Sequence, residues 1–233
     1  MDIIDIIVGN ADPMRVQKHF LCQVPFFAKC LQPGFTEHEE RTIRLPEDDP
    51  EEVEQLLKHA VSGGEALKKE LVQDIQTSYF DRRRDIFAVK LYILANKFGY
   101  EDMQNSVVDA LRQSYNEVIP LATVFYPLEA AGLQGSKLFA YLTSSMVDSI
   151  EGQGWEFMAE RPGWNEWIAN GGRSVRQVMK KLVSYGGAPD PENMERFICR
   201  WHDHVSTPKC RESDEDVNSG DDLADIDDVE GRK

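Results

Sequence analysis

The order of strand and helix patterns in the first hundred residues constrains the fold more than any other feature of this chain. Residues 3–8 form a run of β-branched side chains that is typical of a buried strand, and Gly9-Asn10 follows as a turn. Asp12-Pro13 is a second turn signal, so Arg15–Gln17 is predicted to return as the hairpin partner. Thr42–Leu45 alternates between apolar and polar residues and predicts a further strand.

Short helices are predicted around these strands. The segment His19–Leu31 is apolar at helical spacing, but proline disrupts a helix interior, so we expect two short helices that meet at Val24-Pro25. Asp49-Pro50 predicts a helix start, with aspartate as the N-cap and proline in the first helical position. The apolar stripe of that helix ends at Gly63-Gly64.

A pair of longer helices closes this part of the chain. Residues 65–84 are mostly polar and are interpreted as a partly helical insertion, with Arg82–Arg84 in a solvated loop. Helical periodicity is strong from Asp85 to Gly99, and it resumes from Met103 to Leu111 after a short break. Two helices joined by so short a link must lie antiparallel.

This succession of motifs closely resembles the BTB/POZ domain in the form common in fungal proteins. The resemblance covers residues 3–113 and rests on the order and spacing of several segments: Arg15–Cys22, Pro25–Leu31, Gly34–Glu37, Ile43–Pro50 and Leu91–Gly99. It implies an α+β fold over residues 1–113, in which a small sheet is flanked by a cluster of helices. It also implies a protein-interaction module and not an enzyme.

The chain departs from the family pattern at several positions. It has Gln17 where members usually have histidine, Val24 where they usually have serine, and Val61-Ser62 where they often have tyrosine-threonine. Valine is a poor N-cap, so Val24 is expected to cost about 1 kcal/mol of local stability. These departures indicate a diverged member.

Residues 114–205 are predicted to form a mainly α-helical region that resembles, more weakly, the extension of many fungal BTB domains around Gly135–Leu138. Ser136, Ser174 and Asp190-Pro191 are the predicted starts of its helices. Trp155, Trp164, Trp167 and Trp201 lie in this region. We interpret the four tryptophans as core residues, with an exposed peptide groove as the alternative.

Net charge and composition restrict the classes of partner. The chain carries a formal charge of -15, which repels nucleic acids and anionic membranes, and no apolar stretch is long enough to cross a bilayer. Residues 206–233 are strongly acidic and predict a disordered tail, which either solubilises the protein or docks a basic partner. Four scattered cysteines and the lack of a signal peptide favour an intracellular location, cytoplasmic or nuclear.

Phe35 and Glu37 are the candidate site residues. In BTB adaptors a hydrophobic-x-Glu element between the second helix and the next strand inserts into a cullin, and Phe35-Thr36-Glu37 matches that element. An exposed aromatic on a loop is a natural interface anchor. The alternative is that Phe35 folds back under the sheet and Glu37 is merely solvated.

No cofactor, metal or catalytic site is expected. His202 and His204, with Cys199 and Cys210, do not have the spacing of a familiar zinc site, and Cys22 and Cys30 are interpreted as buried helix-face residues. No catalytic motif occurs.

The resemblance therefore leads to one principal functional hypothesis: a substrate adaptor that binds a cullin ubiquitin-ligase scaffold through its first domain and an unknown substrate protein through its helical half. The alternative is a homotypic scaffold with no role in ubiquitin transfer. Since little sequence precedes the first strand for strand exchange, we expect a monomer or a weak homodimer.

Overall fold

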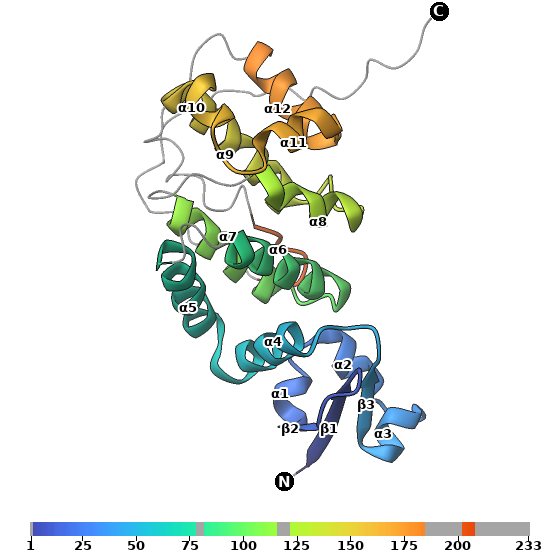
Figure 1. The fold of residues 1–233 in the computed structure, drawn as a ribbon. Helices are drawn as coiled ribbons and strands as arrows, with labels where there is room; N and C mark the ends of the chain where they lie inside the picture. Colours follow the sequence, from blue (N-terminus) through green and yellow to red (C-terminus); the bar gives the residue numbers. More distant parts are fainter. Residues whose placement is uncertain (1, 78–81, 116–121, 185–201, 208–233) are drawn as a thin grey trace, which may run out of the picture.

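The computed structural model describes residues 2–77, 82–115, 122–184 and 202–207. Its described elements follow one another in layers, from a small sheet at one end to a group of short helices at the other (Figure 1). The chain is thus of the mixed α+β class, as predicted. Residues 208–233 of the predicted acidic tail lie outside the described residues, as do the predicted helix at Asp190-Pro191 and Trp201. The predicted start of the disordered tail at residue 206 is wrong, because Ser206 and Thr207 are described and form hydrogen bonds with Glu101.

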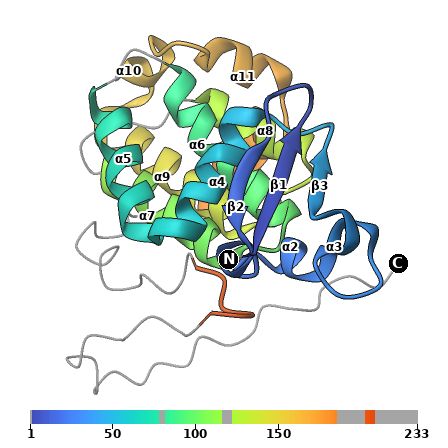
Figure 2. The same cartoon turned by 90° about the horizontal axis from the view of Figure 1, so that it is seen from below.

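The sheet has the order β2-β1-β3. Strand β1 (Ile3–Val8) pairs antiparallel with β2 (Met14–Gln17), which confirms the predicted hairpin, and parallel with β3 (Thr42–Leu45). Alternate residues of β1 are buried, and Ile6 among them lies opposite Met14 of β2 and Ile43 of β3. Helices cover one face of this sheet (Figure 2).

Three short helices connect β2 to β3, and the first two meet where the proline predicts. Helix α1 (Lys18–Leu21) ends before Val24, and α2 (Pro25–Cys30) begins at Pro25. Val24 forms no side-chain cap, but its side chain is fully buried. Its burial offsets the missing capping hydrogen bond, so the expected loss of local stability from this valine has a compensating gain in the core.

Helix α4 (Pro50–Ser62) lies over the sheet and begins as predicted. The Asp49 side chain accepts hydrogen bonds from the backbone amides of Glu51 and Glu52, at 2.9 and 3.3 Å. The apolar face of α4 contributes Val53, Leu56 and Leu57 to the core.

The segment predicted to be a partly helical insertion is helical over most of its length, as predicted, but this helix packs into the core. Helix α5 (Gly64–Thr77) starts directly after α4 and packs against α7, with Leu67, Leu71 and Val72 buried. The loop predicted for Arg82–Arg84 is also wrong, because these residues begin α6 (Arg82–Lys97).

Helices α6 and α7 (Glu101–Tyr115) pack together as the predicted αα-hairpin. Phe98, directly after α6, joins the hairpin to the first layer, since its ring stacks on Phe26 at 4.8 Å and lies 5.3 Å from Phe27. One continuous apolar core runs from the sheet through this hairpin into the helices that follow.

The remaining described elements are helical. They are η1 (Ala122–Val124), α8 (Phe125–Ala130), α9 (Lys137–Gln153), α10 (Trp155–Ala159), α11 (Trp164–Asn170) and α12 (Arg173–Ser184). Ser136 caps α9 as predicted, because its hydroxyl accepts from the Phe139 amide at 3.2 Å. None of the helices in the described ranges is long and apolar enough to cross a bilayer.

Candidate functional site

The turn between α2 and α3 (Thr36–Glu40) presents the first candidate residue to solvent. Phe35 occupies the N-cap position of α3 in an extended backbone conformation, and its side chain is 41% exposed. Gly34, immediately before it, adopts a φ of 97°, which a residue with a Cβ rarely adopts. Phe35 therefore does not fold back under the sheet.

Backbone hydrogen bonds hold Phe35 on both sides. Its amide donates to the Gln32 carbonyl at 3.3 Å, and its carbonyl accepts from the His38 amide at 3.1 Å. The His38 ring lies 2.9 Å, through Nδ1, from the Leu31 carbonyl and closes the turn across seven residues. The turn thus has a defined conformation, held by bonds on both sides of the exposed ring.

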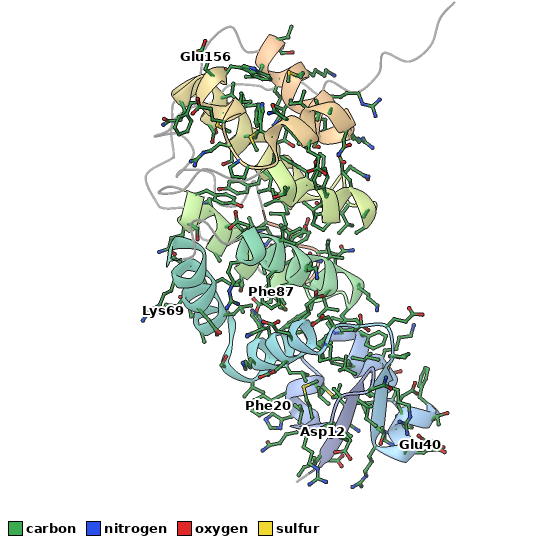
Figure 3. All side chains as sticks on the ribbon, viewed as in Figure 1. Asp12, Phe20, Glu40, Lys69, Phe87 and Glu156 are labelled. Carbon is green, nitrogen blue, oxygen red and sulfur yellow. The ribbon has the colours of Figure 1, made fainter. Side chains whose placement is uncertain are left out.

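Glu37 lies two residues beyond Phe35, in the first turn of α3, and is half-buried. A carboxylate in this position is favoured by the helix dipole. Glu40, at the end of the same helix, is exposed, and α3 lies at the sheet end of the molecule beside β3 (Figure 3). Phe35 and Glu37 therefore share one short surface segment at the sheet end of the protein.

The two described cysteines are not buried, so that prediction is wrong. Cys22 is exposed because α1 ends at Leu21 and leaves it in the link to α2. Cys30 is half-buried at the end of α2, where Phe27 takes the core position. Burial and the nearby charge of Glu37 raise the pKa of the Cys30 thiol, which keeps it protonated at neutral pH.

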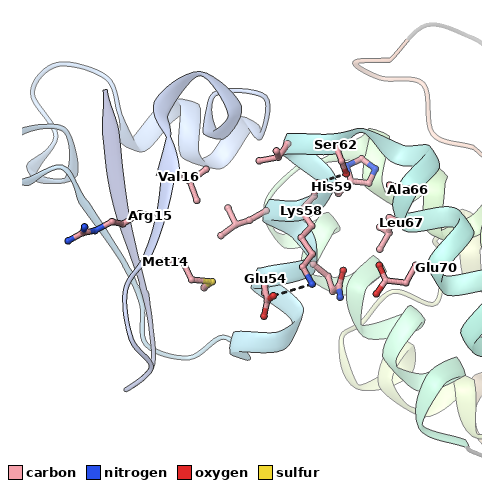
Figure 4. Close-up of a pocket in the computed structure, with 13 residues that line it drawn as sticks. Met14, Arg15, Val16, Glu54, Lys58, His59, Ser62, Ala66, Leu67 and Glu70 are labelled. Carbon is pink, nitrogen blue, oxygen red and sulfur yellow. Dashed lines mark hydrogen bonds and ion pairs between the residues drawn. The ribbon is translucent and has the colours of Figure 1, made fainter. Parts of the chain in front are cut away.

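A groove of about 600 Å³ lies between β2, α4 and α5 and has no counterpart among the sequence predictions (Figure 4). It is bounded by the outer side of β2, which is an edge strand of the sheet. The apolar residues along it are Met14, Val16, Leu57, Val61, Ala66 and Leu67. Its rim carries Glu54, which pairs with Lys58 at 3.1 Å, and Glu70.

His59 lies at this groove but serves as a buried connection between helices. Its Nδ1 is 3.0 Å from the Tyr100 hydroxyl, and its Nε2 is 3.1 Å from the Ser106 hydroxyl. Burial lowers the pKa of His59, although the Asp102 carboxylate at 3.7 Å opposes that shift. Because both ring nitrogens have partners, the neutral ring joins α4 to α7.

Aromatic side chains gather at the other end of the molecule. Phe125, Phe139, Trp164 and Trp167 form what we term the C-terminal aromatic cluster, and all four are buried. The rings of Phe125 and Trp167 stack at 5.7 Å, and Trp164 lies 5.0 Å from Trp167. The interpretation as core is confirmed for Trp164 and Trp167, but it is wrong for Trp155, which is 43% exposed.

The two histidines that were considered as metal ligands have protein partners. His202 Nε2 lies 3.0 Å from an Asp109 carboxylate oxygen, and His204 Nδ1 lies 3.3 Å from the Thr207 hydroxyl. Cys199 and Cys210 lie outside the described residues. Within the described ranges, no group of three or more His, Cys, Asp or Glu side chains is placed to hold a metal ion.

Sequence and structure comparisons do not place this chain in a family. No protein-family model, no curated protein and no solved structure matches it.

Proposed function

We propose that the protein is a BTB/POZ-type interaction module that binds a cullin scaffold through Phe35 and Glu37 and holds a substrate protein through its helical half. The observation that carries the proposal is the exposure of Phe35 on a turn with a fixed backbone. An anchor that is already ordered loses little conformational entropy when it binds. The proposal assigns the protein no catalytic activity.

Glu37 supplies the polar part of the proposed contact. It lies on the same short segment as Phe35, so one partner surface can contact both side chains. A pocket that takes an aromatic ring and pairs a neighbouring carboxylate with a basic group would recognise this segment by shape and charge. Such an adaptor acts by bringing a ligase and its target together at high effective concentration.

The proposal is tested by measuring the affinity of the full chain for a purified cullin N-terminal domain by calorimetry. We expect a dissociation constant of about 1 micromolar and at least tenfold weaker binding by Phe35→Ala, a loss of about 1.4 kcal/mol. Phe157→Ala is the matched control, since Phe157 is 42% exposed but lies in α10 at the opposite end. Binding by this control should be unchanged.

A second pair of variants tests the carboxylate. Glu37→Gln removes the charge at the proposed contact, and Glu40→Gln removes an exposed charge from the same helix. We expect only Glu37→Gln to weaken binding. Equal losses in both variants would mean that the cullin senses only the net charge of α3, and no binding of the unmodified chain at about 100 micromolar would reject the cullin partner.

Homotypic assembly is the second candidate because one observation favours it. Strand β2 is an edge strand of the described sheet and borders an apolar groove, and strand addition at a sheet edge is a common mode of association. Light scattering of the full chain distinguishes the two candidates. A tight dimer at low micromolar concentration that Val16→Lys dissociates, together with no cullin binding, would favour the scaffold.

A further inference from the structure

Three polar side chains form a line along α7 and hold a distant segment of the chain. Glu101, Asn105 and Asp109 are spaced four residues apart, so they lie on one face of the helix. The segment 202–207, orange-red in Figure 1, runs along this face, and we term it the C-terminal strap. The contacts join residues about a hundred positions apart in sequence, as the bond between Asn105 and Asp203 does.

The first half of the strap is bound through Asn105 and Asp109. The Asn105 side chain donates to the Asp203 carbonyl at 2.8 Å and accepts from the Asp203 amide at 3.0 Å. His202, which is almost fully buried, contacts Asp109 at 3.0 Å. Lys68 and Arg112 also form ion pairs with Asp109, at 3.8 and 3.9 Å, so this carboxylate has three basic neighbours including His202.

The second half of the strap is bound through Glu101. One carboxylate oxygen accepts from both the amide and the hydroxyl of Ser206, each at 2.6 Å, and the other accepts from the Thr207 hydroxyl at 3.0 Å. Burial alone would raise the pKa of Glu101, but these hydrogen bonds outweigh it and lower the pKa below its ordinary value. Glu101 is therefore a carboxylate anion at neutral pH.

Thr207 is also distinguished by the residue that follows it. The chain contains eleven prolines, and Pro208 alone is preceded by serine or threonine. Proline restricts the preceding residue to an extended conformation, and a threonine followed by proline is the substrate element of proline-directed protein kinases. Val205 is 95% exposed and Ser206 is exposed, so this end of the strap lies at the surface.

We propose that Thr207 is a phosphorylation site and that its phosphorylation releases the C-terminal strap from α7. In the reaction, Thr207 Oγ1 attacks the γ-phosphorus of a nucleoside triphosphate. The bond from that phosphorus to the bridging oxygen breaks, the nucleoside diphosphate leaves, and the hydroxyl proton passes to a base of the kinase. The proposal is independent of the cullin hypothesis.

Release follows from the position of Glu101. The hydroxyl hydrogen that Thr207 donates to Glu101 is replaced by a group that carries a charge of about -1.5 to -2 at pH 7 and accepts hydrogen bonds. The phosphate on Thr207 and the carboxylate of Glu101, both anions, then face each other, whereas before phosphorylation the hydroxyl donated a hydrogen bond to the carboxylate. The cations Lys68 and Arg112 contact Asp109, roughly 12 Å further along the helix, and do not offset this repulsion.

The Nδ1 atom of His204 lies 3.3 Å from the Thr207 hydroxyl, and this histidine belongs to the strap itself. A contact between its ring and the new phosphate would move with the strap and would not hold it on α7. Release would expose Glu101 and Asn105 together with the buried ring of His202. The modification thus converts a covered polar face of α7 into an open one.

The first experiment asks whether Thr207 is modified. The full chain is incubated with a purified proline-directed protein kinase, ATP and Mg²⁺, and the phosphate is located by mass spectrometry. We expect phosphate on Thr207 in the unmodified chain and in Ser206→Ala, and none at this position in Thr207→Ala. Absence of phosphate from Thr207 overturns the proposal, whether or not a free peptide spanning residues 202–212 is labelled.

The second experiment asks whether the strap is released. Hydrogen exchange of the Asp203 and Ser206 amides reports the bonds to Asn105 and Glu101. Phosphorylation should raise the exchange rates of both amides by at least about tenfold, which corresponds to a loss of about 1.4 kcal/mol in the free energy of opening. If phosphorylation leaves these exchange rates unchanged, the proposal that the strap is released is wrong.

A charge-reversal variant separates repulsion from a general loss of structure. In Glu101→Lys, phosphorylation of Thr207 brings together opposite charges, so it should slow the exchange of these amides relative to the same variant without phosphate. The comparison is made within one variant, so any cost of the lysine itself cancels. Faster exchange on phosphorylation of Glu101→Lys contradicts the mechanism.

Discussion

The turn before α3 and the C-terminal aromatic cluster place large aromatic side chains in opposite environments. Phe35 is 41% exposed and is positioned by the backbone hydrogen bonds of its turn, whereas Trp167 is 1% exposed and is positioned by its neighbours. Trp167 stacks on Phe125 and donates from Nε1 to the Ser174 hydroxyl at 2.8 Å. Main-chain hydrogen bonds thus fix the position of Phe35, whereas packing in the core fixes the position of Trp167.

This difference separates stability from recognition. Replacement of a buried aromatic removes transfer free energy and leaves a cavity, so the fold is affected first. Replacement of an aromatic held only by its backbone leaves the turn in place and removes contact area for a partner. Variants of the two regions should therefore fall into distinct classes.

The largest effect is expected at the C-terminal aromatic cluster. Trp167→Ala should lower the free energy of unfolding by about 3–5 kcal/mol, because it removes a buried indole and leaves Ser174 without this hydrogen bond. Urea unfolding followed by circular dichroism measures the loss. Trp155→Ala is the control, and a loss as large as that of Trp167→Ala would contradict the contrast between buried and exposed tryptophans.

A half-buried carboxylate of α9, that of Asp148, gives a smaller effect on stability that depends on pH. Burial, with the neighbouring charge of Glu151, raises the pKa of Asp148 from 3.8 to about 6, although Lys181 opposes the shift. The folded chain therefore keeps a proton that the unfolded chain loses between these values, and stability falls as the pH rises through this window. One carboxylate oxygen of Asp148 is buried and has no hydrogen-bond partner among the residues that the structure describes.

Asp148→Asn removes this titration. We expect the variant to raise the free energy of unfolding by about 1–2 kcal/mol at about pH 7.5 and to change it little at about pH 3.5, where both states are largely protonated. Urea unfolding at the two pH values measures the difference. Glu151→Gln should change stability less at either pH, and an equal gain from Asp148→Asn at both pH values would refute the burial argument.

Sequence patterns predicted the elements that local chemistry specifies. The hairpin of β1 and β2, the break at Pro25 and the cap at Asp49 were predicted because each depends on residues close together in the chain. Helix α5 was missed as a core element because its buried side chains, Leu67, Leu71 and Val72, are few among polar residues. Its burial comes from α7, which no local pattern contains.

The sequence also indicated only part of the candidate surfaces. The resemblance noted in the sequence suggested Phe35 and Glu37 as candidate residues, but it did not indicate that α3 begins directly after Phe35 or that Glu37 is half-buried. The groove beside β2 and the bonds of the C-terminal strap to Glu101 and Asn105 depend on residues far apart in the sequence. Polar contacts of this kind have no hydrophobic periodicity, so only the fold reveals them.

The turn that presents Phe35 should itself be sensitive to its glycine. Gly34 has a positive φ, and a Cβ at this position would meet nothing within 4 Å, so Gly34→Ala should cost about 1 kcal/mol from backbone strain alone. Gly135→Ala is the matched control, because Gly135 has similar free space without positive φ. Unfolding midpoints in urea report both. Equal effects of the two substitutions would show that the backbone of this turn is not strained by a side chain.

The smallest effect on stability is expected from Phe35→Ala, at less than about 1 kcal/mol, because the ring is largely outside the core. Phe27→Ala in the adjacent helix is the contrasting variant, since Phe27 is fully buried and its loss should cost about 3–5 kcal/mol. Urea unfolding of the two variants under one condition provides the comparison. A loss from Phe35→Ala close to that from Phe27→Ala would assign Phe35 to the core, and any accompanying loss of cullin binding would then reflect a damaged fold. A stable Phe35→Ala variant with weakened binding would instead locate the effect at the contact surface.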